Sequence, residues 1–120
     1  MAFACANPDP ANETAVTWCE ARSVLQQKCV RCHQDPPQNE APFPLLTFED
    51  VHATPYAQMY DVDDEAWELM LNAVETGFMP PVTLFPDLDP PVEPLTDDEK
   101  NTLLDWLRAE APANGPTDCP

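Results

Sequence analysis

Apolar residues recur at steps of three and four in three stretches of the chain, a spacing that places them on one face of a helix. The stretches are residues 14–28, 63–77 and 96–111. Their apolar positions are Trp18, Ala21, Val24, Leu25 and Cys29, then Ala66, Trp67, Met70, Leu71 and Val74, then Leu103, Leu104, Trp106 and Leu107. No segment alternates apolar and polar residues convincingly, so we predict an all-α fold built on these helices.

Capping residues give the expected ends of the helices. We predict Thr14 as the N-cap of the first helix and Asp63 as the N-cap of the second. Gly77 stands where a helix often ends in a left-handed conformation. Thr96-Asp97-Asp98-Glu99 is a capping box, which predicts the start of the last helix.

Proline-rich segments join the helices. Residues 34–44 and 82–94 hold too many prolines for a helix or a central strand. Between them, Thr47 is the expected cap of a short helix that Pro55 ends. The apolar residues of this region are expected to fill the core or to line a cofactor pocket; they are Phe43, Leu45, Leu46 and Phe48.

Length and charge limit the function. The chain has 120 residues, enough for one domain, and we divide it into a flexible leader (1–13), a helical domain (14–111) and a C-terminal tail (112–120). Twenty-two acidic residues against five basic ones give a net charge of −17. This charge would repel nucleic acid and anionic lipid and attract a basic partner, although it could serve solubility alone. No apolar stretch is long enough to span a membrane.

Two of the five cysteines lie in Cys29-Val30-Arg31-Cys32-His33. The pattern C-x-x-C-H is typical of c-type haem attachment. Two thiols three residues apart on one helical turn can reach the two vinyl groups of one porphyrin and form thioethers. The histidine that follows then lies beneath the ring, where its imidazole can bind iron.

Two other sites use the same residue types. A redox-active disulfide places C-x-x-C at the start of a helix after a strand, whereas the residues before Cys29 are predicted to be helical. A zinc site needs four ligands, and the chain has no second close cysteine pair. Both interpretations are therefore weaker than haem attachment.

The three other cysteines are Cys5, Cys19 and Cys119. Their odd number allows one disulfide at most within the chain. Because the ends of a small domain often lie near one another, we prefer the pair Cys19–Cys119, with the two pairings of Cys5 left open. Cys5 is also a candidate for lipidation. A disulfide would favour an oxidising compartment.

Iron in an electron carrier usually has a second axial ligand. The candidates are Met59, Met70, Met79 and His52. Met70 lies among apolar residues in a helix and is expected in the core. Met79 is preferred, because Gly77 ends a helix before it and Pro80-Pro81 stiffens the chain after it. His52 is the runner-up.

The order of these motifs resembles the class I monohaem cytochromes c, with the likeness covering about residues 15–110. It rests on the helix leading into Cys29-Val30-Arg31-Cys32-His33, on Met79-Pro80-Pro81, and on the closing helix. The resemblance implies an all-α fold wrapped around one haem c, with the first and last helices packed across each other. It implies that Cys29 and Cys32 bind the haem covalently, with His33 as proximal and Met79 as distal ligand.

The same resemblance implies a proline whose carbonyl accepts a hydrogen bond from the proximal imidazole, and Pro42 and Pro44 both match. It implies a soluble one-electron carrier rather than an enzyme, located in the periplasm or otherwise outside the cytoplasm. Residues 82–94 form an insertion, and Lys28 and Lys100 are the only lysines. A redox partner with basic surface patches is therefore expected. The alternatives are a peroxidase-type haem enzyme with an open distal site and the electron-entry domain of a larger oxidoreductase.

Overall fold

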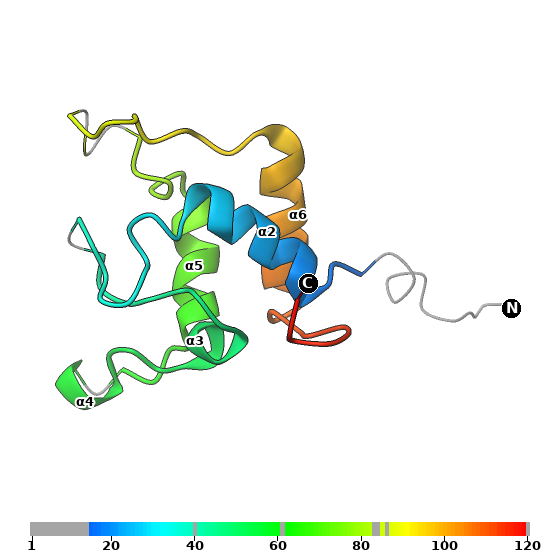
Figure 1. The fold of residues 1–120 in the computed structure, drawn as a ribbon. Coiled ribbons are helices and arrows are strands. Elements are labelled where there is room, and N and C mark those ends of the chain that lie inside the picture. Colours follow the sequence, from blue (N-terminus) through cyan, green and yellow to red (C-terminus); the bar gives the residue numbers. More distant parts are fainter. Residues whose placement is uncertain (1–14, 40, 61, 83–84, 86, 120) are drawn as a thin grey trace, which may run out of the picture.

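The computed structural model describes residues 15–39, 41–60, 62–82, 85 and 87–119. These residues contain five α-helices and no strand, which confirms the predicted helical class (Figure 1). The helices are α2 (Trp18–Lys28), α3 (Phe48–His52), α4 (Ala57–Tyr60), α5 (Ala66–Glu75) and α6 (Asp97–Arg108). None of the helices in this part of the chain combines the length and the apolar character needed to cross a membrane.

The core lies where α2, α5 and α6 meet. In Figure 1, α2 crosses α6, and the two helices are in contact. The rings of Trp18 and Trp106 lie 5.7 Å apart at this crossing, and each side chain is only 1% exposed. α5 packs on α6 and α3 packs on α5. Most of the predicted stripe residues are buried here. Of the apolar residues expected in the core or in a pocket wall, Leu45 is buried in the core and Leu46 is 37% exposed.

The start of α2 differs from the prediction. Its N-cap is Thr17, while Thr14, the predicted cap, lies outside the described residues. The Thr17 hydroxyl accepts a hydrogen bond from the Glu20 backbone N–H at 3.1 Å, and the Glu20 carboxylate accepts one from the Thr17 N–H at 2.9 Å. This reciprocal pair satisfies two N–H groups that have no partner within the helix.

The start of α5 also differs, because Glu65 rather than Asp63 is its N-cap. The Glu68 carboxylate accepts a hydrogen bond from the Glu65 N–H at 2.9 Å. The predicted stop is confirmed, since Gly77 follows the helix with a φ of +80°. The predicted caps Thr47 and Thr96 are confirmed as well, each in a capping box.

Residues 111–119 fold back onto α2. The Trp18 backbone N–H donates to the Ala113 carbonyl at 2.9 Å, and its indole N–H donates to the Thr117 carbonyl at 3.1 Å. Cys19 and Cys119 form a disulfide, which confirms the preferred pairing. Cys5 and the leader proposed for residues 1–13 lie outside the described residues.

Candidate functional site

The C-x-x-C-H residues form a single turn at the end of α2, which we name the attachment turn (residues 29–33). The Cys29 N–H still donates to the Leu25 carbonyl at 2.8 Å, so the turn continues directly from the helix. The Cys29 carbonyl then accepts hydrogen bonds from the N–H groups of Cys32 at 3.2 Å and His33 at 3.0 Å. The two thiols are not paired with each other, and both side chains are partly buried. One turn therefore carries both thiols and the imidazole.

His33 has a fixed ring orientation. Its side chain is buried, and Nδ1 lies 2.7 Å from the carbonyl oxygen of Phe43. Because a carbonyl can only accept, Nδ1 carries the proton and Nε2 keeps its lone pair. No residue in the described part of the chain forms a hydrogen bond with Nε2. This is the arrangement in which the second nitrogen of a histidine is available to a metal.

The acceptor for His33 corrects the expectation from the resemblance. It is the carbonyl of Phe43, which lies between the two candidates Pro42 and Pro44. The Phe43 ring also packs on the imidazole, with ring centroids 5.2 Å apart. One residue thus restrains His33 through both its carbonyl and its side chain.

The proline-rich loop after the attachment turn is tied to it. The Gln38 N–H donates to the Cys32 carbonyl at 2.7 Å, and the Leu45 N–H donates to the His33 carbonyl at 2.7 Å. The Asn39 amide nitrogen lies 3.4 Å from the Cys32 sulfur. These bonds hold the loop so that the Phe43 carbonyl faces the imidazole.

Burial sets the protonation of the site. It raises the pKa of the Cys29 thiol to about 12, and the negative charges of a Cys32 thiolate and Glu99 add to the effect. Burial also lowers the pKa of His33, while the hydrogen bond to Phe43 acts in the opposite direction. The imidazole is therefore favoured in its neutral, ligating form. A thiol that resists ionisation does not suit a redox-active disulfide, which needs a stabilised thiolate.

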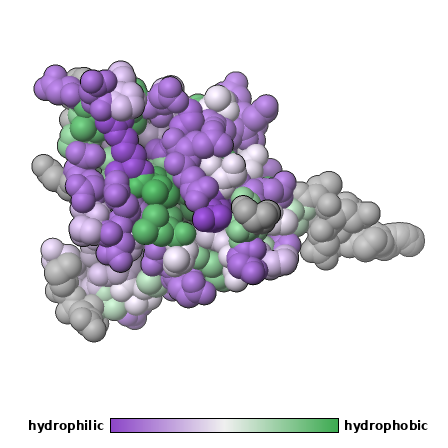
Figure 2. Space-filling view, in the orientation of Figure 1, coloured by the Kyte–Doolittle hydropathy of each residue, from purple (hydrophilic) through white to green (hydrophobic). Residues whose placement is uncertain are grey.

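Met79 lies in the loop that follows α5. Its side chain is half-buried, and its N–H donates to the Ala73 carbonyl in the last turns of α5 at 3.1 Å. In Figure 1 the loop after α2 and the loop after α5 both extend to the left of α2, α5 and α6. Figure 2 shows a hydrophobic patch over α5, near the middle of a face on which hydrophilic residues predominate.

The other candidate ligands are placed differently. Met70 is only 7% exposed and belongs to the core, as predicted. The side chain of Met59 lies outside what the structure describes. His52 has both ring nitrogens engaged, with Nδ1 2.8 Å from the Glu65 carboxylate and Nε2 2.7 Å from the Ala111 carbonyl. Neither nitrogen is left for iron.

A hollow of about 440 Å³ lies along the exposed side of α5. Its lining consists of Asp64, Glu68, Leu69, Asn72, Ala73, Thr76 and Phe78. None of these is a predicted site residue. Within the described residues, no three His, Cys, Asp or Glu side chains gather where they could hold one metal ion together. Cys29, Cys32 and His33 thus do not by themselves make a common zinc site.

Comparison of the chain with protein-family models, with curated proteins and with solved structures found no match in any of the three. The function is therefore argued from the residues of the site.

Proposed function

We propose that this protein is a one-electron carrier that binds one haem c covalently at the attachment turn. The observation that carries the proposal is the buried imidazole of His33, oriented by Phe43 and placed in the same turn as two unpaired thiols. Cys29 and Cys32 would form the thioethers, and His33 Nε2 and the Met79 thioether would be the axial ligands. The residues fit haem c in type, spacing and protonation.

The haem, when bound, would supply iron that alternates between the ferric and ferrous states. The chain would contribute a fixed imidazole, a soft thioether and an apolar setting. A neutral thioether favours ferrous iron and raises the reduction potential. With a ligand held on each side, the site would exclude oxygen and peroxide from the iron, which separates a carrier from a peroxidase.

His52 supports Met79 as the second ligand. Both of its ring nitrogens already have acceptors, in Glu65 and in Ala111. A histidine bound in this way is not poised as a sixth ligand or as the distal base of a peroxidase.

Charge and the disulfide indicate the setting. A net charge of −17 would steer the protein to a redox partner with a basic surface patch. The Cys19–Cys119 disulfide favours an oxidising compartment outside the cytoplasm.

The proposal is tested by expressing the chain with a c-type haem maturation system and measuring intact mass and optical spectrum. We expect a mass increase of about 616 Da, the mass of one haem, that survives extraction with acid and solvent. The double variant C29S/C32S should lose it, and the control C5S should keep it. A colourless wild-type chain, or haem removed by extraction, would refute the proposal.

The preference for a basic partner is tested with two small redox reagents, one positively and one negatively charged. Added salt should slow reduction of the ferric protein by the hexaammineruthenium(II) cation and accelerate oxidation of the ferrous protein by the ferricyanide anion. If salt changes neither rate, the net charge of the protein does not steer its redox reactions and serves solubility alone.

A further inference from the structure

Two of the chain's five basic residues flank Cys29, and both bind the same distant segment. Lys28 ends α2, and Arg31 lies between the two haem-binding cysteines proposed above. Their partners lie in residues 87–95, which we name the strap. The guanidinium of Arg31 donates to the Pro90 carbonyl, and the ammonium of Lys28 donates to the Pro94 carbonyl at 3.1 Å.

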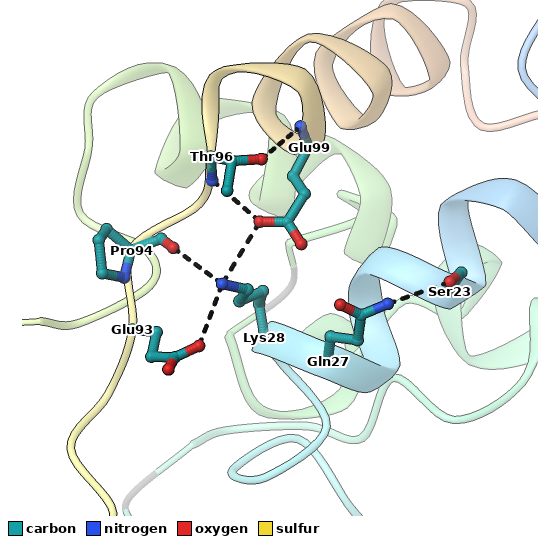
Figure 3. Close-up of polar contacts among 7 residues, drawn as sticks. All are labelled: Ser23, Gln27, Lys28, Glu93, Pro94, Thr96 and Glu99. Carbon is teal, nitrogen blue, oxygen red and sulfur yellow. Dashed lines mark hydrogen bonds and ion pairs between the residues drawn. The ribbon is translucent and has the colours of Figure 1, made fainter.

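The Lys28 contacts are shown in Figure 3. Its Nζ lies 3.3 Å from the Glu93 carboxylate and 3.4 Å from the Glu99 carboxylate. The Lys28 side chain is only 11% exposed, although it carries a charge. Two of the three oxygen partners of this ammonium, from Glu93 and Pro94, belong to the strap, and the Glu93 side chain is itself 75% exposed. The contact therefore ties the strap to the end of α2 through two hydrogen bonds from one charged group.

The contact between Lys28 and Glu99 links the strap to helix α6. Glu99 lies in the first turn of α6, and its carboxylate also accepts a hydrogen bond from the Thr96 N–H at 2.9 Å. Lys28 therefore joins the end of α2, the strap and the start of α6 at one point (Figure 3).

The strap is also the far end of the segment that carries Met79. Residues 80–86 connect Met79 to it, and Pro80 and Pro81 limit the freedom of that connection. At its near end Met79 is held by the hydrogen bond from its own N–H to Ala73. Met79 is thus held to α5 by its own N–H. The strap begins eight positions later in the sequence and is bound to the attachment turn by Lys28 and Arg31.

We propose that Lys28 and Arg31 are positioning residues that hold the strap against the attachment turn and so restrain Met79 as a ligand of the iron. This inference rests on the proposed function. A thioether is a weak ligand on a side chain with three rotatable bonds, so its occupancy depends on how firmly its loop is held. The side chains of Lys28 and Arg31 would contact neither the iron nor the redox partner. They would act through the strap.

The test uses the haem-containing variants K28Q, R31Q and K28Q/R31Q, with R22Q as control. Arg22 lies on α2, bears the same charge, and has no hydrogen bond or ion pair to the strap among the described contacts. The first readout is the ¹⁵N heteronuclear NOE of Leu88, Val92 and Glu93 in the ferrous protein, which reports motion of the strap. The second is the rate at which imidazole replaces Met79 on ferric iron, which reports release of the thioether.

In K28Q/R31Q we expect lower NOE values in the strap and about tenfold faster imidazole uptake, the effect of losing one or more charge-assisted hydrogen bonds. R22Q should match the wild type in both. R31K, which keeps a donor for Pro90, should give NOE values and an imidazole uptake rate closer to those of the wild type than R31Q does. If K28Q/R31Q folds poorly, the milder variant E93Q weakens the contact between Lys28 and Glu93 from the side of the strap.

Strap amides as rigid in K28Q/R31Q as in the wild type would overturn the anchoring. A loosened strap with unchanged imidazole uptake would overturn the positioning of Met79. Failure of the proposed function is distinguishable, because the wild-type chain itself would then lack covalent haem. In that case the NOE comparison on the haem-free chain still decides whether Lys28 and Arg31 hold the strap.

Discussion

Nδ1 of His33 lies 2.7 Å from the carbonyl oxygen of Phe43, and this contact orients the imidazole. It fixes the tautomer, so the lone pair is at Nε2, and it fixes the plane of the ring. A hydrogen bond from the remote nitrogen also makes a histidine a stronger donor to a metal. In the proposed haem site, the ligand on the haem face opposite His33 is the next to be tested.

Replacing Met79 by Ala is expected to lower the reduction potential by on the order of 100 mV, because the axial ligand is a main determinant of the potential. The ferric iron should also bind added imidazole rapidly. Potentiometric titration followed by optical spectroscopy measures both effects. M70L is the matched control, since Met70 belongs to the core, and its potential should stay close to that of the wild type. An unchanged spectrum in M79A would show that another residue is the ligand.

Replacing His52 by Ala is expected to reduce stability while leaving the haem spectrum intact. The variant loses hydrogen bonds that tie α3 to Glu65 at the start of α5 and to Ala111 beyond α6. The loss should be about 1–3 kcal/mol in the free energy of unfolding, measured with urea. Combining H52A with E65Q should cost less than the sum of the two single effects, because they share one contact. A changed axial ligation in H52A would instead identify His52 as the sixth ligand.

The helix starts show what local sequence could and could not predict. Each observed N-cap has an acidic residue three positions later, such as Glu20 after Thr17 and Glu68 after Glu65. The two caps predicted wrongly, Thr14 and Asp63, have no acid at that position. Thr17 was therefore readable from the capping-box pattern, since Glu20 supplies the acceptor for its N–H. Glu65 was not, because the pattern begins with Ser or Thr.

Two features of the site had no such local signal. The acceptor for His33 is a backbone carbonyl, which every residue has, so the choice of Phe43 over its proline neighbours depends on the path of the loop. The contact of Lys28 with Glu93 joins residues 65 positions apart. A spacing rule cannot supply such pairs, because they follow from how the helices pack.

Removing the Cys19–Cys119 disulfide is expected to destabilise the fold. The bridge closes a loop spanning 100 positions, for which the chain-entropy model gives about 4.7 kcal/mol. The double variant C19S/C119S should therefore unfold at a markedly lower urea concentration. C5S is the control, since the described pairing does not involve Cys5. Equal stability of C19S/C119S and the wild type would mean that the bridge does not constrain the unfolded chain, and peptide mapping without reduction would identify the true pairing.

Glu99 should make the fold sensitive to acid. Its pKa is lowered first by the hydrogen bond from the Thr96 N–H, with desolvation opposing and the charge and hydrogen bond of Lys28 adding to the decrease. A carboxylate with a lowered pKa in the folded state stabilises the fold above its unfolded pKa, and this contribution is lost as the pH falls through the folded pKa. The loss is therefore expected below about pH 4.5, the ordinary range of a glutamate.

The variant E99Q tests this dependence by urea unfolding at about pH 6 and about pH 3.5, on either side of that range. Wild type should exceed E99Q clearly in the free energy of unfolding at the higher pH, and the gap should narrow at the lower one, where Glu99 becomes protonated. D105N is the control, because Asp105 is exposed on α6 and no described side chain pairs with its carboxylate. The free energy of unfolding of D105N should differ little from that of the wild type at either pH. A gap between wild type and E99Q that persists unchanged in acid would show that Glu99 acts through packing rather than through its charge.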